Sequence, residues 1–536
     1  MKRLSDFIDR DSARYLGLDE TLAAFSPVSD AGRRQAQRLM VYAPGEEAAL
    51  RAHHERASTA VALIQNRPDS ADRLLYHLRE LPRIDDAWPL QWGQSEIALL
   101  VAFRYHHHRL RQELEGAPLL AQWLNLVAPA DLDGGALGDP GSSRFYIDDR
   151  RNPALAEQRR RIKEAQAEIH REKTTQRQAL CLRHGLPETA DQWVVDREDQ
   201  TLINRLMADP DVALVGETVA SVRFAPRTGE RLATLRSAYA SLLQGERRIE
   251  TGLYLEIEKA LRPRSLIWMT QAQKLVELDL LLAVAKTALA WKAVAPRIDS
   301  DPAAPLTVAA GAHKPLEDVV RAEGAAYVPL DWEAAEPVAV LTGANMGGKT
   351  VVLQTLGWLQ ALVQLGFFVP AAQLRTRLYS RVAALGAQGE TLGGLSGFGR
   401  EIERLSKLLP FRRDGVLYLL DEPARTTHAR EGRAIIRAVL EAIAASPSCG
   451  VVATHFDGLA GEGYAWMRMR GLRREVVAEW RSRGGEARPP LHHLMDYRVE
   501  RADDADATRP DALRVAELLG LEGAIIARAQ TLLDAD

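Results

Sequence analysis

The first segment that could do chemistry reads Gly343-Ala344-Asn345-Met346-Gly347-Gly348-Lys349-Thr350, which fits the pattern G-x-x-x-x-G-K-[ST] without a mismatch. Glycines allow backbone N–H groups to turn inward around a phosphate, and the start of a helix adds partial positive charge. In such a loop the ammonium group of Lys349 reaches the β- and γ-phosphates, and the Thr350 hydroxyl ligates Mg²⁺. The segment therefore predicts a binding site for ATP and magnesium.

Two acids follow an apolar run further along the chain. The run occupies residues 416–420, and Asp421 and Glu422 come directly after it. Asp421 suits the holding of Mg²⁺, and Glu422 suits the polarisation of an attacking water molecule. A strand that ends in two acids is a weak signal alone, but it gains weight because a phosphate-binding loop precedes it. Together the two segments predict hydrolysis of the nucleotide.

Two further residues are candidates for contact with the γ-phosphate. His455 ends the apolar run 451–454. A single histidine is more often structural, but its order after the loop and the acidic strand favours a catalytic place. Ser396 stands in a glycine-rich segment before a helical stretch, where its hydroxyl and the neighbouring amides could bind phosphate. Taken alone, that segment would indicate only a loop and a helix cap.

The elements that must position these residues change in kind near residue 300. Residues 296–305 contain three prolines and read as a linker. Short β-branched runs then alternate with helical stretches, with strands expected at 338–342, 416–420 and 450–454 and helices at 349–365 and 431–445. This alternation predicts an α/β domain with a mostly parallel sheet.

The first 300 residues are predicted to be mainly helical. Helices are expected at 51–64, 96–114, 230–260 and 271–294, with a long polar arm at about 153–184 and a strand pair at 212–227 that turns near Gly216. The adjacent histidines at 106–108 would point in different directions on a helix, which disfavours a metal site there. The arginines of the polar arm could meet phosphates, but glutamates accompany them, so a solvated helix face is favoured.

The amino-acid composition limits the cellular compartment and the kinds of binding partner that we expect. The 536 residues carry 69 Lys and Arg against 72 Asp and Glu, a formal charge of −3. This balance excludes a strongly basic protein that net charge alone would drive onto nucleic acid, and it leaves a local basic stripe open. Two widely spaced cysteines give no disulfide framework, which fits a reducing cytoplasm. The N-terminus does not read as a signal peptide, and the most apolar stretch, 278–294, contains three charges. We expect a cytoplasmic protein without a membrane span.

From residue 311 onward the motifs resemble those of the MutS family of ABC-type ATPases. Residues 342–350 look like the family's TGPNMGGKS/T, and 366–371 resemble its GCFVPA element. Ser396-x-Phe398-x-x-Glu401 resembles the signature STFxxE, and Ala453-Thr454-His455-Phe456 resembles the ATHY switch. The resemblance implies an α/β ABC-type P-loop ATPase domain at 301–505, preceded by a mainly α-helical core and lever-like domain at 1–300. A C-terminal helical dimerisation segment at 506–536 would complete the chain.

The same resemblance assigns roles within a dimer. Tyr327 falls where the family has an aromatic residue that stacks on adenine, and Tyr497 would flank the base. Ser396 would contact the γ-phosphate bound by the other subunit, and His455 would sense that phosphate. A homodimer with two composite sites closed by ATP is therefore implied.

Two departures from mismatch-repair MutS proteins leave the target open. No mismatch-recognition element is found near the N-terminus, which is typical of a short form. Residues 421–427, Asp-Glu-Pro-Ala-Arg-Thr-Thr, look like the MutS-related ATPases associated with cobalamin-dependent lysine or ornithine aminomutases. One hypothesis is an ATPase coupled to DNA binding of the mismatch-repair type, with DNA held by the helical core. The alternative is an ATP-dependent reactivating partner of an aminomutase. A protein with vestigial hydrolysis is disfavoured because the catalytic residue types are all present.

Overall fold

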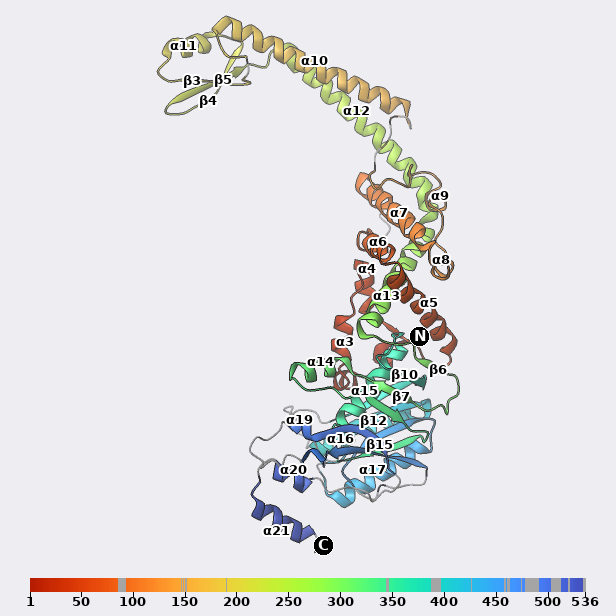
Figure 1. Cartoon of the computed structure of the whole chain (residues 1–536). Coiled ribbons are helices and arrows are strands. Elements are labelled where there is room, and N and C mark those ends of the chain that lie inside the picture. Colours follow the sequence, from red (N-terminus) through yellow and green to blue (C-terminus); the bar gives the residue numbers. More distant parts are fainter. Residues whose placement is uncertain are drawn as a thin grey trace. The chain divides into compact units, whose positions relative to one another are not determined.

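The structure is a computed structural model of the whole chain (Figure 1). It describes residues 1–84, 93–145, 147, 149, 152–188, 190–343, 347–386, 397–425, 427–456, 459, 463–473, 475–477, 491–502, 512–518 and 521–533. The chain divides into two compact units. Unit 1 comprises Met1–Leu81, Arg109–Leu126 and Ala272–Asp536, and unit 2 comprises Pro82–His108 and Val127–Gln271.

The main sheet of unit 1 has the strand order β11-β12-β13-β9-β14-β15. Its strands are β9 (Val338–Thr342), β11 (Arg381–Leu385), β12 (Val416–Asp421), β13 (Cys449–Ala453), β14 (Tyr464–Leu472) and β15 (Met495–Arg501). Neighbouring strands run parallel, except that β14 and β15 pair antiparallel. The prediction of a mostly parallel sheet is confirmed.

Helices accompany the central strands of this sheet. They are α15 (Lys349–Gln364), α16 (Gly397–Leu408) and α17 (Ala429–Ala444). Every residue of β9 is buried, and α15 is buried over most of its length. The strands predicted at 338–342, 416–420 and 450–454 and the helices predicted at 349–365 and 431–445 all form, within two residues of the expected bounds. Continuous apolar runs are typical of parallel strands covered on both faces.

Unit 1 contains a second sheet. Its strand order is β6-β10-β7-β8, with β6 (Arg297–Asp299), β7 (Thr307–Gly311), β8 (Leu330–Glu333) and β10 (Gln373–Arg377). Helix α14 (Lys314–Ala322) connects β7 to β8. The helix begins at His313, whose ring accepts a hydrogen bond from the N–H of Leu316.

The first residues of the chain lie on the edge of the main sheet. They form β1 (Lys2–Arg3), α1 (Leu4–Phe7), α2 (Arg10–Tyr15), α3 (Leu18–Ala24), α4 (Asp30–Ala36) and β2 (Met40–Val41). Ile8 makes a parallel bridge with Val382 of the edge strand β11. The domain ranges predicted from the sequence stay predictions, although the contacts group residues 1–81 with the C-terminal sheet.

The remaining helices include those expected at 51–64, 96–114 and 271–294, together with shorter helices that were not predicted. They are α5 (Glu47–Asn66), α6 (Pro68–Arg79), α7 (Gln94–Leu114), α8 (Pro118–Leu124), α9 (Pro129–Asp133) and α13 (Ser265–Trp291), with α20 (Ala512–Leu518) and α21 (Gly523–Leu533) near the C-terminus. Among the described residues, no helix combines the length and the apolar character needed to cross a bilayer.

Unit 2 contains a helical hairpin made of α10 (Pro153–His184) and α12 (Glu230–Leu261), which lie side by side (Figure 1). The predicted polar arm is α10. Its cap is Asn152, whose side chain accepts from two backbone N–H groups, and proline follows at the first helical position. The Gln158 side chain joins the two helices by donating to the Leu242 carbonyl at 2.6 Å.

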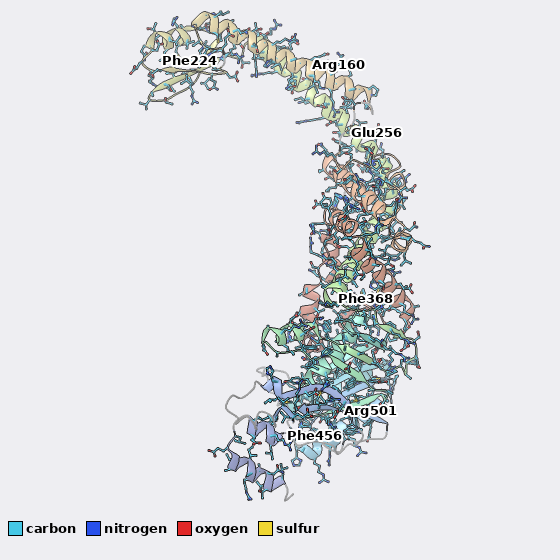
Figure 2. The ribbon with its side chains drawn as sticks, in the orientation of Figure 1. Arg160, Phe224, Glu256, Phe368, Phe456 and Arg501 are labelled. Carbon is cyan, nitrogen blue, oxygen red and sulfur yellow. The ribbon has the colours of Figure 1, made fainter. Side chains whose placement is uncertain are left out.

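The segment of chain that connects α10 to α12 forms a small antiparallel sheet. It has the order β3-β5-β4, with β3 (Trp193–Asp196), β4 (Val212–Glu217) and β5 (Ser221–Pro226), and α11 (Gln200–Ala208) accompanies it. Phe224, labelled in Figure 2, is fully buried in its core. The predicted strand pair is confirmed, and the chain turns close to Gly216 as expected. Gly216 lies at a register shift inside β4, and the chain turns after Glu217.

Candidate nucleotide-binding site

The phosphate-binding loop joins the buried strand β9 to the start of α15. Gly343 has φ +136° and Gly348 has φ +94°, backbone conformations that side chains other than hydrogen rarely allow. A Cβ atom at Gly343 would lie 2.8 Å from the Cβ of Met469, so the close passage of β14 also requires glycine there. Ala344, Asn345 and Met346 lie outside the described residues.

Lys349 is held beside the loop that it is predicted to serve. Its Nζ donates to the Gly343 carbonyl at 2.7 Å and lies 3.5 Å from Oε1 of Glu422. The Lys349 side chain is 5% exposed and that of Glu422 is 17% exposed. A nearly buried ammonium group next to a helix start favours anions.

The residues predicted to hold magnesium are in direct contact. The Thr350 hydroxyl donates to Oδ2 of Asp421 at 2.8 Å. Burial raises the pKa of Asp421, while the hydrogen bonds that it accepts act in the opposite direction. No group of three or more His, Cys, Asp or Glu side chains able to hold a metal occurs in the described part of the chain. A pair of this kind suits Mg²⁺, which takes few protein ligands beside water and phosphate oxygens.

An unusual backbone carries Glu422. Its φ is +45°, and that of Ala424 is +60°, left-handed values that cost on the order of 1 kcal/mol or more outside glycine. The N–H of Glu422 donates to the Ala453 carbonyl at 2.8 Å, and the N–H of Ala424 donates to Oε2 of Glu401 at 2.9 Å. These bonds fix the turn after β12, so the Glu422 carboxyl group is held at the cavity.

A cavity of about 440 Å³ opens beside these groups, within the usual size range of small-molecule sites. Its lining includes the polar set Gly347, Gly348, Lys349, Thr350 and Glu422 and the apolar and aromatic set Leu316, Val320, Tyr327, Val328 and Tyr497. The structure therefore brings the predicted aromatic residues to the same cavity as the phosphate-binding loop. Apolar and aromatic side chains together with a lysine at a helix start fit a molecule with a base and phosphates.

Two of the aromatic contacts show how this wall is built. The Tyr327 hydroxyl accepts from the N–H of His313 at 3.0 Å, and burial raises its pKa. Gly348 leaves room for Tyr497, whose Cδ1 would lie 3.2 Å from a Cβ atom at that position. Tyr327 is thus held by the backbone of His313, and Tyr497 packs closely against Gly348.

His455 does not line the cavity in the described structure. The His455 side chain is exposed at the end of β13, its ring is 4.6 Å from that of Phe456, and the described lining residues do not include it. Ser396 lies outside the described residues. Their predicted contacts with the γ-phosphate stay predictions, as do the catalytic and metal-binding roles of the other site residues.

Sequence reasoning missed Tyr15. Its hydroxyl donates to Oδ2 of Asp421 at 3.2 Å, although the two residues are 406 positions apart. Burial and the charge of Asp421 raise the pKa of Tyr15 well above its usual range, so the phenol remains a donor. No local pattern around Tyr15 marks this role, because the contact depends on the docking of α2 against the sheet.

The fold is an α/β domain with a mostly parallel sheet, and its residues 343–350 carry the G-x-x-x-x-G-K-[ST] pattern of a phosphate-binding loop. Residues 339–535 match the family model described as MutS domain V, the P-loop ATPase domain of that family. The resemblance to MutS is therefore confirmed over this region. The short form and the link to aminomutase-associated ATPases stay predictions.

Curated relatives extend the similarity beyond this domain. The DNA mismatch repair protein MutS of Thermus aquaticus is 31% identical over 290 residues, which cover 54% of this chain and 33% of the relative. Its counterpart in Dinoroseobacter shibae is 29% identical over 290 residues, covering 53% and 31%. That of Natronomonas pharaonis is 31% identical over 278 residues, covering 49% and 29%. The chain thus spans about a third of the length of these relatives.

Proposed function

We propose that this chain is a MutS-like ATPase that binds ATP with Mg²⁺ at the cavity beside Lys349 and hydrolyses it. One observation carries the proposal. The hydrogen-bonded pair Thr350–Asp421 lies at the same helix start as Lys349, and Glu422 lines the same cavity. These residues come from segments that are far apart in sequence, and each has the type that nucleotide hydrolysis requires.

Each side chain has a definite task in this proposal. Lys349 exchanges its bond to the Gly343 carbonyl for phosphate oxygens, while Thr350 and Asp421 hold the metal. The bound Mg²⁺ neutralises charge on the phosphates. Glu422 orients the attacking water and accepts its proton. Tyr327 and Tyr497 contact the base.

The proposal includes a homodimer. Ser396 of a second copy would reach the γ-phosphate, and His455 would turn to sense it. Support comes from α21, where Ile525, Leu532 and Leu533 are 49%, 52% and 56% exposed. Because positions seven and eight apart share one helix face, these residues form an apolar stripe without cover in a single chain. Residues 506–536 are therefore proposed to join the two copies.

The target of the ATPase is proposed to be DNA. Support comes from the relatives, which are named DNA mismatch repair proteins. The polar arm α10 is not the favoured contact. Arg159 lies 2.9 Å from carboxylate oxygens of Glu246 and Glu250, and Arg160 forms ion pairs with glutamates of its own helix. The other helices of the predicted helical core, residues 1–300, are the better candidates.

The test is ATP hydrolysis with homoduplex, mismatched and branched DNA and without DNA, at several salt concentrations. We expect a change of rate that depends on DNA and fades as salt rises, because phosphate contacts release counterions. Light scattering with and without ATP measures whether two copies associate. A rate that no DNA alters would reject DNA as the target and favour a protein partner such as an aminomutase, the alternative suggested by residues 421–427.

A further inference from the structure

The N-terminal segment, residues 1–25, docks on β11 through directional bonds. Ile8 bridges Val382, and the Ser12 hydroxyl accepts from the Ala384 N–H at 2.9 Å. The Ser12 side chain is fully buried. An edge strand presents unpaired backbone groups, so this docking satisfies groups that β11 would otherwise leave open.

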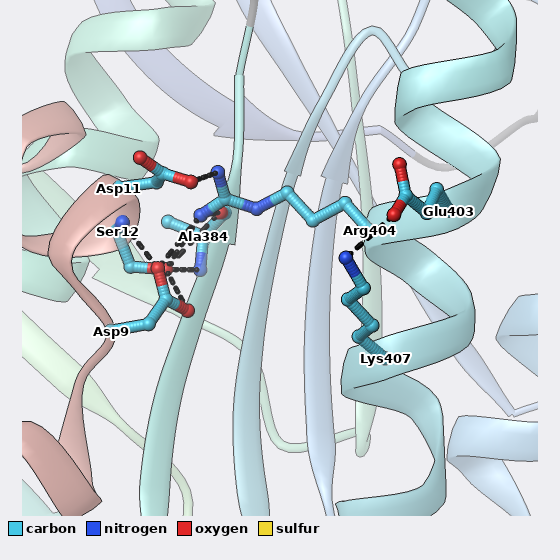
Figure 3. Close-up of polar contacts among 7 residues, drawn as sticks. All are labelled: Asp9, Asp11, Ser12, Ala384, Glu403, Arg404 and Lys407. Carbon is cyan, nitrogen blue, oxygen red and sulfur yellow. Dashed lines mark hydrogen bonds and ion pairs between the residues drawn. The ribbon is translucent and has the colours of Figure 1, made fainter.

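Arg404 of α16 ties the same segment to a second element of the ATPase fold (Figure 3). Its Nη2 donates to the Ala384 carbonyl at 2.8 Å and to Oδ1 of Asp9 at 3.1 Å, and its Nη1 lies 3.0 Å from Oδ2 of Asp11. Asp9 is also the cap of α2, because it accepts from the N–H of Ser12. The guanidinium group therefore fixes the start of α2 against both β11 and α16.

Tyr15 stands at the other end of α2, where two features fix its position. The Gln354 side chain of α15 donates to the Tyr15 carbonyl at 2.7 Å. Gly386 leaves the space that the ring occupies, because a Cβ atom there would lie 2.1 Å from Cε2 of Tyr15. The phenol is thus aimed at Oδ2 of Asp421, the oxygen that also accepts from Thr350.

We propose that Tyr15 is a positioning residue that holds the Asp421 carboxylate in the orientation needed to bind magnesium. With Oδ2 occupied by two donors, the other carboxylate oxygen remains for the metal or its water. In this proposal the N-terminal segment contributes a side chain to the ATPase site, although the sequence assigned it to the helical domain. This inference rests on the proposed function, and it adds a residue that the nucleotide-binding motifs do not contain.

The test compares Tyr15→Phe with Tyr418→Phe in the full chain. Tyr418 is a matched control, since it lies on the same strand as Asp421 and its buried hydroxyl donates to the Leu408 carbonyl at 2.9 Å. Two quantities are measured: the affinity for a fluorescent ATP analogue in EDTA, and the Mg²⁺ concentration that gives half-maximal hydrolysis. For Tyr15→Phe we expect unchanged affinity in EDTA and a rise of about tenfold in the Mg²⁺ requirement, which equals about 1.4 kcal/mol. Saturating Mg²⁺ should restore most of the rate, and Tyr418→Phe should behave like wild type.

The outcomes separate this inference from the proposed function. A wild-type chain that binds no nucleotide would overturn both. Hydrolysis in wild type with an equal Mg²⁺ requirement in Tyr15→Phe would overturn the role of Tyr15 alone. An equal rise in both tyrosine variants, or a loss of affinity in EDTA, would mean that the hydroxyl supports packing and does not position the carboxylate. Gly386→Ala gives an independent reading, because displacement of the Tyr15 ring should raise the Mg²⁺ requirement as Tyr15→Phe does.

Discussion

Replacement of Glu422 by glutamine changes the proposed catalytic base with little change of shape. The backbone at this position is held by the bond from its N–H to the Ala453 carbonyl, which the substitution does not touch. The Lys349 ammonium group keeps its bond to the Gly343 carbonyl at 2.7 Å. The variant should therefore fold, with a loss of about 1 kcal/mol in the free energy of unfolding from the weakened contact at 3.5 Å.

The expected effect on catalysis is much larger than the effect on stability. Glutamine cannot accept the proton of the attacking water, and a general base contributes roughly 10²- to 10⁴-fold in rate. The barrier should therefore rise by about 3 to 5 kcal/mol. Binding should change little or tighten, because the substitution removes a negative charge next to Lys349 and the incoming phosphates.

Single-turnover hydrolysis and equilibrium binding, measured on one preparation, separate these two effects. Glu317→Gln is the matched control, because Glu317 is a nearly buried carboxylate paired with Lys314 and Arg321 on the neighbouring helix α14 and does not line the cavity. It should hydrolyse ATP as wild type does. Hydrolysis by Glu422→Gln within twofold of wild type would refute the assignment of the base, and loss of ATP binding would show that Glu422 instead builds the site.

Two further predictions concern the frame of the site. Gly348→Ala places a Cβ atom at φ +94° and 3.2 Å from the Tyr497 ring. Calorimetry should therefore show a loss of about 1 to 2 kcal/mol in the free energy of unfolding, and ATP binding should weaken. The control Gly252→Ala, in an open part of α12, should leave the stability unchanged or raise it. Burial lowers the pKa of His313 to about 4, below its unfolded value near 6.5, so the unfolded chain takes up the proton first as the pH falls. The contribution of neutral His313 to the free energy of unfolding is complete above about pH 6.5 and is lost between pH 6.5 and pH 4, by up to about 3 kcal/mol. In denaturant titrations over that pH range, the free energy of unfolding of His313→Asn should therefore fall less steeply than that of wild type.

Local patterns were sufficient for the central strands and for the phosphate-binding loop. β9, β12 and β13 are continuous apolar runs, and such runs are visible without knowledge of their neighbours. Strand β14 was not predicted from the sequence, because its buried residues alternate with partly exposed ones and arginines are among them. An alternating strand beside a helix-rich sequence carries a weaker signal than an apolar run.

Contacts between distant segments set the limit of the sequence reasoning. The acids after β12 were recognised as a site because their type and order are typical of nucleotide hydrolysis. The hydroxyl of Tyr15 could not be added, since its meeting with Asp421 depends on α2 docking at a sheet edge. The same docking explains why residues 1–25, which share the helical composition of the following residues, lie against the sheet.

The central claim is that this chain binds Mg²⁺·ATP through Lys349 at the start of α15. It is tested most directly by equilibrium binding of a fluorescent ATP analogue to wild type, Lys349→Ala and the control Lys314→Ala, with thermal unfolding to verify that each variant is folded. Wild type and Lys314→Ala should bind the analogue saturably, and Lys349→Ala should bind it about 10- to 100-fold more weakly, because one charge-assisted contact with phosphate is lost. Equal affinity in a folded Lys349→Ala variant, or no binding by wild type, would contradict the account.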